Sequence, residues 1–182
     1  CDFRRHKVVD SLSSLSSWLL KYGKIVNGIE ITAYLGGATS RAAEDYRRLV
    51  GPLLNKGLKD AVEQGMRLRS FNTGILFSSS ILQALPSAYL TRLETKGQDG
   101  PTLAAALPRL NNLEEFRLEE FGGLSVLDAC LPALCQLEKL TSLYLSTTTI
   151  FDTQQLPTHL LQLTLFRHNG LYCSDGQTQL QL

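Results

Sequence analysis

Apolar residues recur along the chain in one short pattern, apolar-x-x-apolar-x-apolar. The copies, clear ones first, are Leu113–Leu118, Leu140–Leu145, Leu160–Leu165, Leu68–Thr73, Leu90–Thr95 and an outlying Val26–Ile31, with Thr178–Leu182 resembling the start of one more. From Leu68 to Leu160, consecutive starts are separated by 22, 23, 27 and 20 residues. A recurrence at such a spacing indicates stacked structural repeats.

A second landmark recurs in phase with the first. Just before four of the predicted strands, a small helix-like segment ends in a Leu-Pro pair. These pairs are Leu85-Pro86, Leu107-Pro108, Leu131-Pro132 and Leu156-Pro157. Because proline cannot continue a helix, each pair predicts the end of a short helix and a turn toward the next strand.

The two landmarks together predict the fold class. In each six-residue copy, the fourth and sixth positions point inward from a strand, and the first anchors the turn into it. No single repeat can bury its apolar side alone, so neighbouring repeats must stack. We therefore predict an α/β solenoid, a partial arc with parallel strands on its concave side and helices on its convex side.

The N-terminal part follows a different pattern. Asp10–Tyr22 is predicted to be an amphipathic helix that ends at Gly23, with Trp18 beside its apolar side. The residues predicted on that apolar side are Leu12, Leu15, Leu19 and Tyr22. Residues 1–25 are therefore interpreted as a helical lead-in or cap. Residues 26–182 are interpreted as the repeat domain, truncated at its C-terminus.

The interval between the first two copies is unusually long, at 42 residues from Val26 to Leu68. Ser40–Val50 is predicted to be helical, Gly51-Pro52 to break or kink the helix, and Leu53–Gln64 to continue it. We interpret the interval as one enlarged repeat with a long helix on the convex side. The alternative is a degenerate repeat hidden near Leu49.

The three clear copies and the Leu-Pro pairs resemble the leucine-rich-repeat family. In addition, Val9–Gly23 running into Val26–Ile31 is similar to the segment that follows the F-box in many plant and algal F-box/leucine-rich-repeat proteins, although the F-box itself is not in this chain. The chain departs from the family where an asparagine is expected shortly after a strand's last leucine. Thr148 and His168 occupy two of these positions.

The resemblance implies a function in protein–protein interaction, usually through the concave sheet. In F-box relatives it implies recognition of a substrate for a ubiquitin ligase. Some algal proteins with similar repeats are instead associated with the cytoskeleton or the ciliary axoneme, which is the alternative.

The third, fifth and seventh positions of each copy are predicted to project from the open sheet face. On two neighbouring copies these positions have opposite charges in every column, so they could form a ladder of ion pairs that needs no ligand. They could equally form a hydrogen-bonding platform beside two aromatic anchors. The predicted partner-binding residues are Arg92, Glu94, Lys96, Glu115, Arg117, Glu119, Tyr144 and Phe166.

Composition limits the class of partner. The chain has 182 residues, 43% of them apolar and 19% charged, with a net charge of +1. This near-neutral balance does not favour binding to nucleic acid or to an anionic membrane. No transmembrane span or signal peptide is predicted. We expect a protein partner and a monomeric module of a larger protein, although a lipidated Cys1 is an alternative to a simple fragment.

Residues that could carry chemistry do not occur in catalytic or metal-binding patterns. The four cysteines, Cys1, Cys130, Cys135 and Cys173, are scattered, which favours reduced thiols and a cytoplasmic location, with cytoskeleton, axoneme or nucleus as alternatives. His159 and His168 have no further ligand at a metal-binding spacing. Gly36-Gly37 and Gly122-Gly123 do not continue into a phosphate-binding loop. We therefore predict that the chain is not an enzyme and has no cofactor and no metal.

Overall fold

The computed structural model describes residues 2–31, 40–73, 79–97, 100–120, 126–147, 156–167 and 176–181. Its α-helices are α1 (Asp2–Tyr22), α2 (Ser40–Glu63), α3 (Ser79–Ala84), α4 (Gly100–Ala106) and α5 (Val126–Leu134). Two short 3-10 helices are η1 (Gly23–Ile25) and η2 (Leu107–Arg109). The strands are β1 (Gly28–Ile31), β2 (Ser70–Thr73), β3 (Arg92–Gly97), β4 (Glu115–Glu120), β5 (Ser142–Thr147), β6 (Gln162–Arg167) and β7 (Gly176–Gln181).

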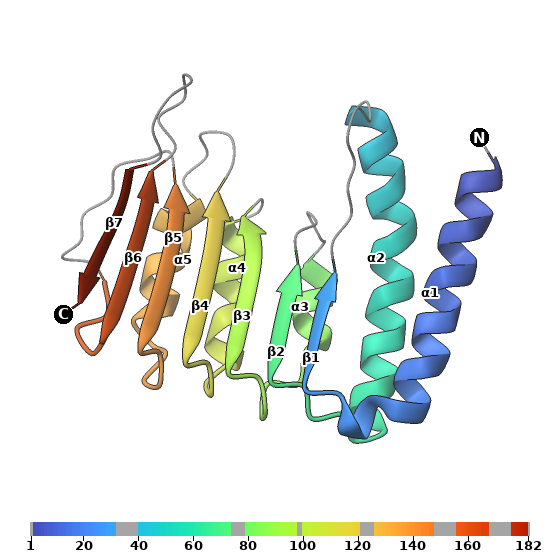
Figure 1. The fold of residues 1–182 in the computed structure, drawn as a ribbon, viewed down its shortest axis with the longest axis horizontal. Helices are drawn as coiled ribbons and strands as arrows, with labels where there is room; N and C mark the ends of the chain where they lie inside the picture. The colour runs from blue at the N-terminus through green and yellow to red at the C-terminus, as the bar shows by residue number, and fades with distance from the viewer. Residues whose placement is uncertain are drawn as a thin grey trace.

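The strands form a single seven-stranded sheet in chain order, and β1 to β6 are all parallel to their neighbours (Figure 1). The register aligns the repeated pattern, because its fourth positions lie opposite one another across the sheet. These aligned residues are Ile29, Phe71, Leu93, Phe116, Leu143 and Leu163. The α/β class and the strand frame predicted from the pattern are confirmed.

Strand β7 corrects one prediction. The residues at the C-terminal end were expected to begin another parallel repeat, but β7 runs antiparallel to β6, with Arg167 opposite Gly176. A parallel neighbour needs a crossover of about a dozen residues or more, usually containing a helix. The chain between β6 and β7 has only residues 168–175, which suffices for a hairpin and not for a crossover.

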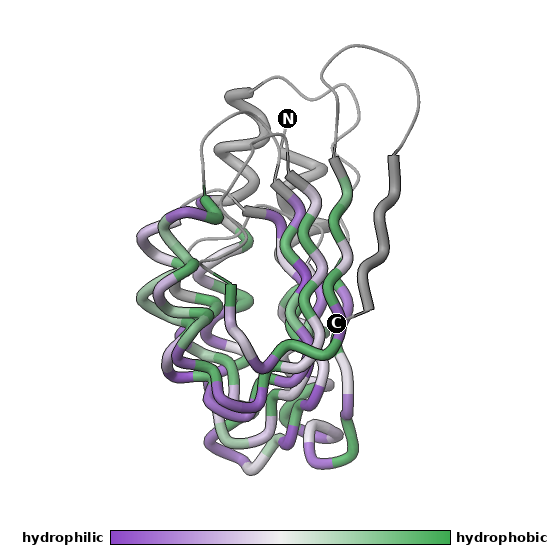
Figure 2. Tube along the Cα trace, turned by 90° about the vertical axis from the view of Figure 1, so that its left-hand side faces the viewer, coloured by the Kyte–Doolittle hydropathy of each residue, from purple (hydrophilic) through white to green (hydrophobic). Residues whose placement is uncertain are grey.

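In the part of the chain that the structure describes, helices cover one face of the sheet and none covers the other, which we call the open face. Helices α3, α4 and α5 lie behind β2 to β5 in Figure 1, and Figure 2 shows the helical layer and the strand layer side by side. Helices α1 and α2 pack against each other at the β1 end of the sheet, and α2 also packs against α3. The apolar core lies between the strand layer and the helical layer.

The core is a ladder of equivalent residues, one set from each repeat. The leucines at the first position are buried in all five copies from Leu68 to Leu160. At the fourth position, Phe71, Leu93, Phe116, Leu143 and Leu163 are buried as well. Burying one such side chain contributes about 1.5–3 kcal/mol. Since each rung packs on the rungs of its neighbours, the repeats stabilise one another.

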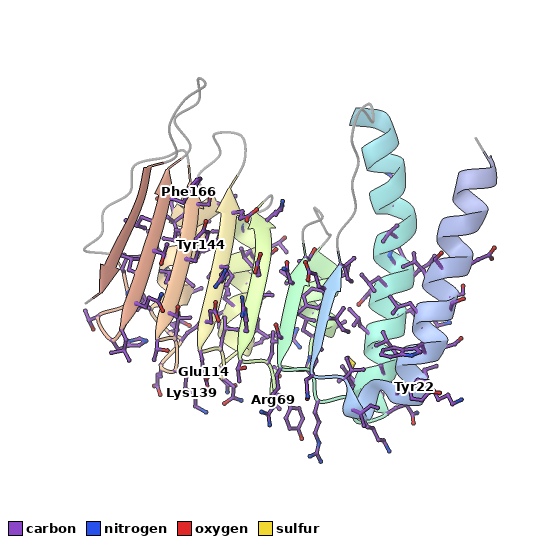
Figure 3. All side chains as sticks on the ribbon, viewed as in Figure 1. Tyr22, Arg69, Glu114, Lys139, Tyr144 and Phe166 are labelled. Carbon is purple, nitrogen blue, oxygen red and sulfur yellow. The ribbon has the colours of Figure 1, made fainter. Side chains whose placement is uncertain are left out.

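A backbone ladder joins the repeats where the strands begin. The second-position carbonyl of Asn27 accepts hydrogen bonds from two N–H groups of the next repeat, Arg69 at 2.8 Å and Ser70 at 3.0 Å. The same doubled bond recurs at four further second positions, namely Arg69, Thr91, Glu114 and Thr141. Figure 3 shows Arg69 and Glu114 along this edge. These repeated bonds hold each strand in register with the one before it.

The Leu-Pro pairs act as predicted at two of their four sites. Helix α3 ends at Ala84, directly before Leu85-Pro86, and α4 ends at Ala106, directly before η2 begins at Leu107. The third prediction is wrong, because Pro132 lies inside α5. Proline removes one helical hydrogen bond, but the next two residues remain helical because both side chains are buried in the core. The helix-like segment before Leu156-Pro157 falls on residues 148–155, outside the described residues.

Helix α1 starts earlier than predicted, at Asp2, and ends at Tyr22 as predicted. Leu19 is buried, whereas Trp18 and Tyr22 are largely exposed, with 48% and 38% of their surfaces accessible. These two rings are in contact, with their centroids 5.6 Å apart. The apolar side of the helix is therefore narrower than the pattern suggested.

Helix α2 is continuous from Ser40 to Glu63, so Gly51-Pro52 does not break it, and of the two predicted outcomes the break is wrong. Leu49 lies inside this helix, which rules out the strand of a hidden repeat at that position. The helix ends in a Schellman motif. Gly65 has a φ of +90°, its N–H donates to Val62, and Met66 N–H donates to Ala61. Glycine adopts this left-handed conformation at little cost.

The packing of α4 on α5 generates a stability prediction. A Cβ atom on Gly100 would lie 2.8 Å from Ala129 Cβ and 3.1 Å from Val126 Cα. We expect Gly100→Ala to lower the free energy of unfolding by about 1–3 kcal/mol, measured by urea denaturation. In the control Gly28→Ala, the new Cβ would meet Ser70 Cβ at an ordinary 3.5 Å. Equal losses in the two variants would contradict the close helix contact.

Candidate functional site

The open sheet face carries the predicted charged rows in the predicted register. Arg92 lies opposite Glu115, Glu94 opposite Arg117, and Lys96 opposite Glu119. The residues between them on β3 and β4 are buried, whereas all six charged side chains are half-buried. The alternation of a strand therefore places the charges on the uncovered face, as predicted.

Residues that lie opposite each other on β3 and β4 form ion pairs at the two ends of the charged rows, but not in the middle. Arg92 Nε is 3.5 Å from Glu115 Oε2, and Lys96 Nζ is 3.3 Å from Glu119 Oε2. In the middle column, Arg117 Nε instead donates to Glu115 Oε1 on its own strand at 2.6 Å. Glu94 reaches Arg92 at 4.0 Å. Glu115 is therefore the centre of the network, bound by two arginines.

This network is balanced and only partly shielded from water. Its three cations and three carboxylates keep between 24% and 42% of their side-chain surface exposed. Exposed pairs of this kind contribute about 0–1 kcal/mol each. The ion pairs therefore add little to the free energy of unfolding, and their main effect is to orient the charged side chains on the sheet face. Glu94 has the loosest of these contacts and is the carboxylate best placed to exchange its partner.

Tyr144 extends the charged rows onto β5. It lies opposite Arg117 in the strand register, and the guanidinium carbon of Arg117 is 5.5 Å from the centre of the tyrosine ring. Burial raises the pKa of the Tyr144 phenol, and the negative charge of Glu119 adds to this effect. The hydroxyl therefore stays protonated at neutral pH and can donate a hydrogen bond to a ligand.

Phe166 lies on β6, diagonal to Tyr144 in the register and directly opposite Ser146. Figure 3 shows both aromatic side chains on the sheet face. Ser146 and Thr164 were also expected to project freely, but both are buried, at 3% and 7% exposure. Each is a small side chain that lies opposite an aromatic residue on the neighbouring strand. This part of the face is therefore more closed than predicted.

A shallow hollow of about 400 Å³ opens at the other end of the face. It extends from β1 to β3 and is lined by Gly28, Ile29, Glu30, Ser70, Asn72, Arg92 and Glu94. The hollow exists because the small residues Gly28 and Ser70 lie side by side in the register. Sequence reasoning placed these residues on the face but did not identify the hollow. In the sequence, the hollow is indicated by two consecutive copies of the pattern that each have a small residue at the third position.

The described histidines and cysteines lie at separate places in the fold. Among them, no group of three or more His, Cys, Asp and Glu side chains could hold a metal ion. The half-buried His159 donates from Nε2 to the Leu137 carbonyl at 2.9 Å, which ties two repeats together. Cys130 is buried and Cys135 exposed, and neither forms a disulfide. Within the same part of the chain, no helix is long and apolar enough to cross a membrane.

The charged rows generate a second prediction. Exchanging the charges by Glu115→Arg with Arg117→Glu places like charges opposite Arg92 and Glu94 and removes the cation from the Tyr144 ring. We expect the free energy of unfolding to fall by about 1 kcal/mol, measured by urea denaturation in low salt. The control Lys56→Glu with Glu138→Arg exchanges charges at two exposed positions away from this face. A loss no larger than that of the control would contradict the network.

Tyr144 generates a pH prediction. Because folding raises its pKa above the ordinary 10.0, the unfolded chain loses this proton first as the pH rises. The contribution is constant at lower pH, and the free energy of unfolding decreases once the pH passes the unfolded value. We expect Tyr144→Phe to reduce that decrease, measured by denaturation across the alkaline range. Identical alkaline slopes in the two proteins would contradict the raised pKa.

The chain was compared with protein-family models, with curated proteins and with solved structures. None of the three comparisons finds a match.

Proposed function

We propose that this chain is a leucine-rich-repeat solenoid whose open, concave sheet face binds a protein partner. Two features support the solenoid: the anchor leucines of successive repeats stack on one another, and the doubled backbone bond recurs from one repeat to the next. Both follow the repeat period seen in the sequence. Helices on one side of a parallel sheet are also what such a repeat requires.

The observation that carries the proposal is a sheet face without a helical cover. A buried parallel sheet normally carries apolar side chains on both of its faces. Here the face opposite α3, α4 and α5 bears arginine, lysine, glutamate, serine and asparagine side chains from β1 to β5. A sheet side with this composition is built to meet water or a polar partner.

The dimensions of the face favour a macromolecule over a small ligand. Six parallel strands at about 4.8 Å spacing span roughly 24 Å. The hollow at its β1 end is shallow and occupies a small part of that span. Tyr144 and Phe166 offer aromatic surface at the other end, and aromatic residues are enriched among those that dominate protein interfaces. A partner could thus insert a side chain into the hollow and pack on the rings.

The F-box resemblance supplies the first candidate for the biological role. In that role, the face would hold a substrate protein for a ubiquitin ligase. The same repeats serve in cytoskeletal or axonemal proteins, so the identity of the bound protein separates the two roles. Ubiquitin-ligase scaffold subunits would support the first role, and tubulin or dynein subunits the second.

The proposal generates a cross-linking prediction. A photo-reactive amino acid in place of Tyr144 should capture one predominant protein from a lysate. The same group in place of Ala105, an exposed residue of α4 on the covered side, should not capture it. We expect the purified partner to bind Phe166→Ala at least about tenfold more weakly than the parent chain, by calorimetry.

The matched control is Pro132→Ala, which alters an exposed residue on the helical side. The proposal fails if this variant weakens binding as much as Phe166→Ala, or if the Ala105 position captures the same protein. Circular dichroism of every variant establishes that a weaker interaction reflects the altered face rather than lost folding.

A further inference from the structure

A second and larger hollow lies away from the open sheet face. It has a volume of about 1090 Å³ and is lined by the second half of α2, the turn after it and the segment that follows α3. Lys24 and Arg109 contribute to it from η1 and η2. We call it the turn groove. Its volume is slightly above the roughly 300–1,000 Å³ that ligand pockets occupy, so the turn groove is much larger than a single small anion requires.

The turn groove follows from the enlarged repeat. Helix α2 has 24 residues and α3 has six, so one helix is about 36 Å long and its neighbour about 9 Å. Two helices so unequal cannot pack evenly along their lengths. The end of α2 and the turn at Gly65 therefore form one wall, and the Pro86–Tyr89 segment forms the other.

The walls of the turn groove are positively charged. The described residues of its lining include four basic ones, Lys24, Lys59, Arg67 and Arg109. Among the same described residues, Glu63 is the one acidic residue. All four cations are exposed, and none forms an ion pair with a carboxylate among the residues that the structure describes. This contrasts with the sheet face, where the cations already have carboxylate partners.

Two of these cations are held by neighbours that leave their charge unneutralised. Arg67 lies over the ring of Tyr89, with 5.5 Å from the guanidinium carbon to the ring centre. Arg109 donates from Nη2 to the Gln83 carbonyl oxygen at 3.3 Å. These contacts limit the conformations of two long side chains. A ligand that pairs with them then loses less side-chain entropy on binding.

The floor of the turn groove is apolar. Met66, Leu85 and Pro86 are buried beneath it, and Val62 is partly buried in its wall. Tyr89 adds an aromatic ring that is 43% exposed. A ligand that suits this lining has negative charges at its edges and apolar groups facing the floor.

We propose that the turn groove binds an extended acidic segment of a partner protein, in which Asp or Glu alternates with apolar residues. The carboxylates pair with the four unneutralised cations, and the apolar side chains contact the floor. This surface is separate from the sheet face, so the chain has two independent protein-binding surfaces. A partner that reaches both gains affinity through the raised effective concentration at the second site.

The lining favours a peptide over the other polyanions. Nonspecific binding of single-stranded nucleic acid uses successive aromatic rings for stacking, and the groove lining offers only Tyr89 among its described residues. Attachment to an anionic membrane uses apolar side chains that protrude into the lipid. In the lining of the turn groove, Met66, Leu85 and Pro86 are buried and do not protrude from the surface.

The test measures fluorescence anisotropy of a fluorescein-labelled peptide of alternating aspartate and leucine, with the 182-residue chain as titrant. A matched peptide has asparagine in place of aspartate. The groove variant is Lys59→Glu with Arg67→Glu. The control variant, Lys56→Glu with Arg69→Glu, changes the net charge equally at two exposed residues that do not line the groove.

We expect the aspartate peptide to bind and to lose at least about tenfold in affinity with the groove variant, while the control variant changes it by less than about threefold. Binding should weaken as salt is added. Equal losses in the two variants, equal affinity for the asparagine peptide, or no binding would overturn the proposal. Tighter groove-dependent binding of oligothymidylate or phosphatidylserine vesicles would overturn it as well. Cross-linking at Tyr144 stays intact in the groove variant, which separates this result from the function of the sheet face.

Discussion

The stacking of one repeat on the next is the interaction on which the rest of the structure depends. No strand here has more than six residues, and a helix as short as α3 would be unstable alone. Each repeat therefore obtains its stability from its neighbours, through the buried leucine at its first position and the two backbone bonds accepted at its second. Helix α2 at one end and β7 at the other depart from this regular unit.

Stacking also explains why the two faces of the sheet differ. The inward positions are committed to the core, and their apolar character is required for any repeat to fold. The outward positions carry no such requirement, so their composition is free to serve binding. In the charged rows on β3 and β4, Glu115 forms ion pairs with Arg92 and Arg117. Arg117 also lies over the Tyr144 ring. The result is a polar surface whose charged side chains are already oriented, and in the proposed function this orientation lowers the entropic cost of binding.

The two proposed surfaces arise from different physical causes. The sheet face is broad because equivalent positions of successive strands lie side by side in the register. The turn groove is a product of irregularity, since a long helix beside a short one leaves space that no side chain of the repeat fills. Their electrostatics differ as well: the cations of the charged rows pair with carboxylates, whereas the described residues provide no carboxylate partner for the cations of the turn groove. This difference is why we propose the turn groove, rather than the sheet face, for an acidic segment.

The sequence by itself determined the strand frame, the register of Arg92 with Glu115 and the burial of the anchor leucines, because each follows from a local period that can be read along one chain. Tertiary structure decided what depends on distant neighbours. Strand β7 runs antiparallel because too few residues precede it for a crossover, and Ser146 is buried although its position in the pattern projects from the sheet face. Arg117 pairs with Glu115 on its own strand rather than with Glu94, which lies opposite it across the sheet. The turn groove joins residues from η1, α2, α3 and η2, and no pattern in the sequence connects segments so far apart.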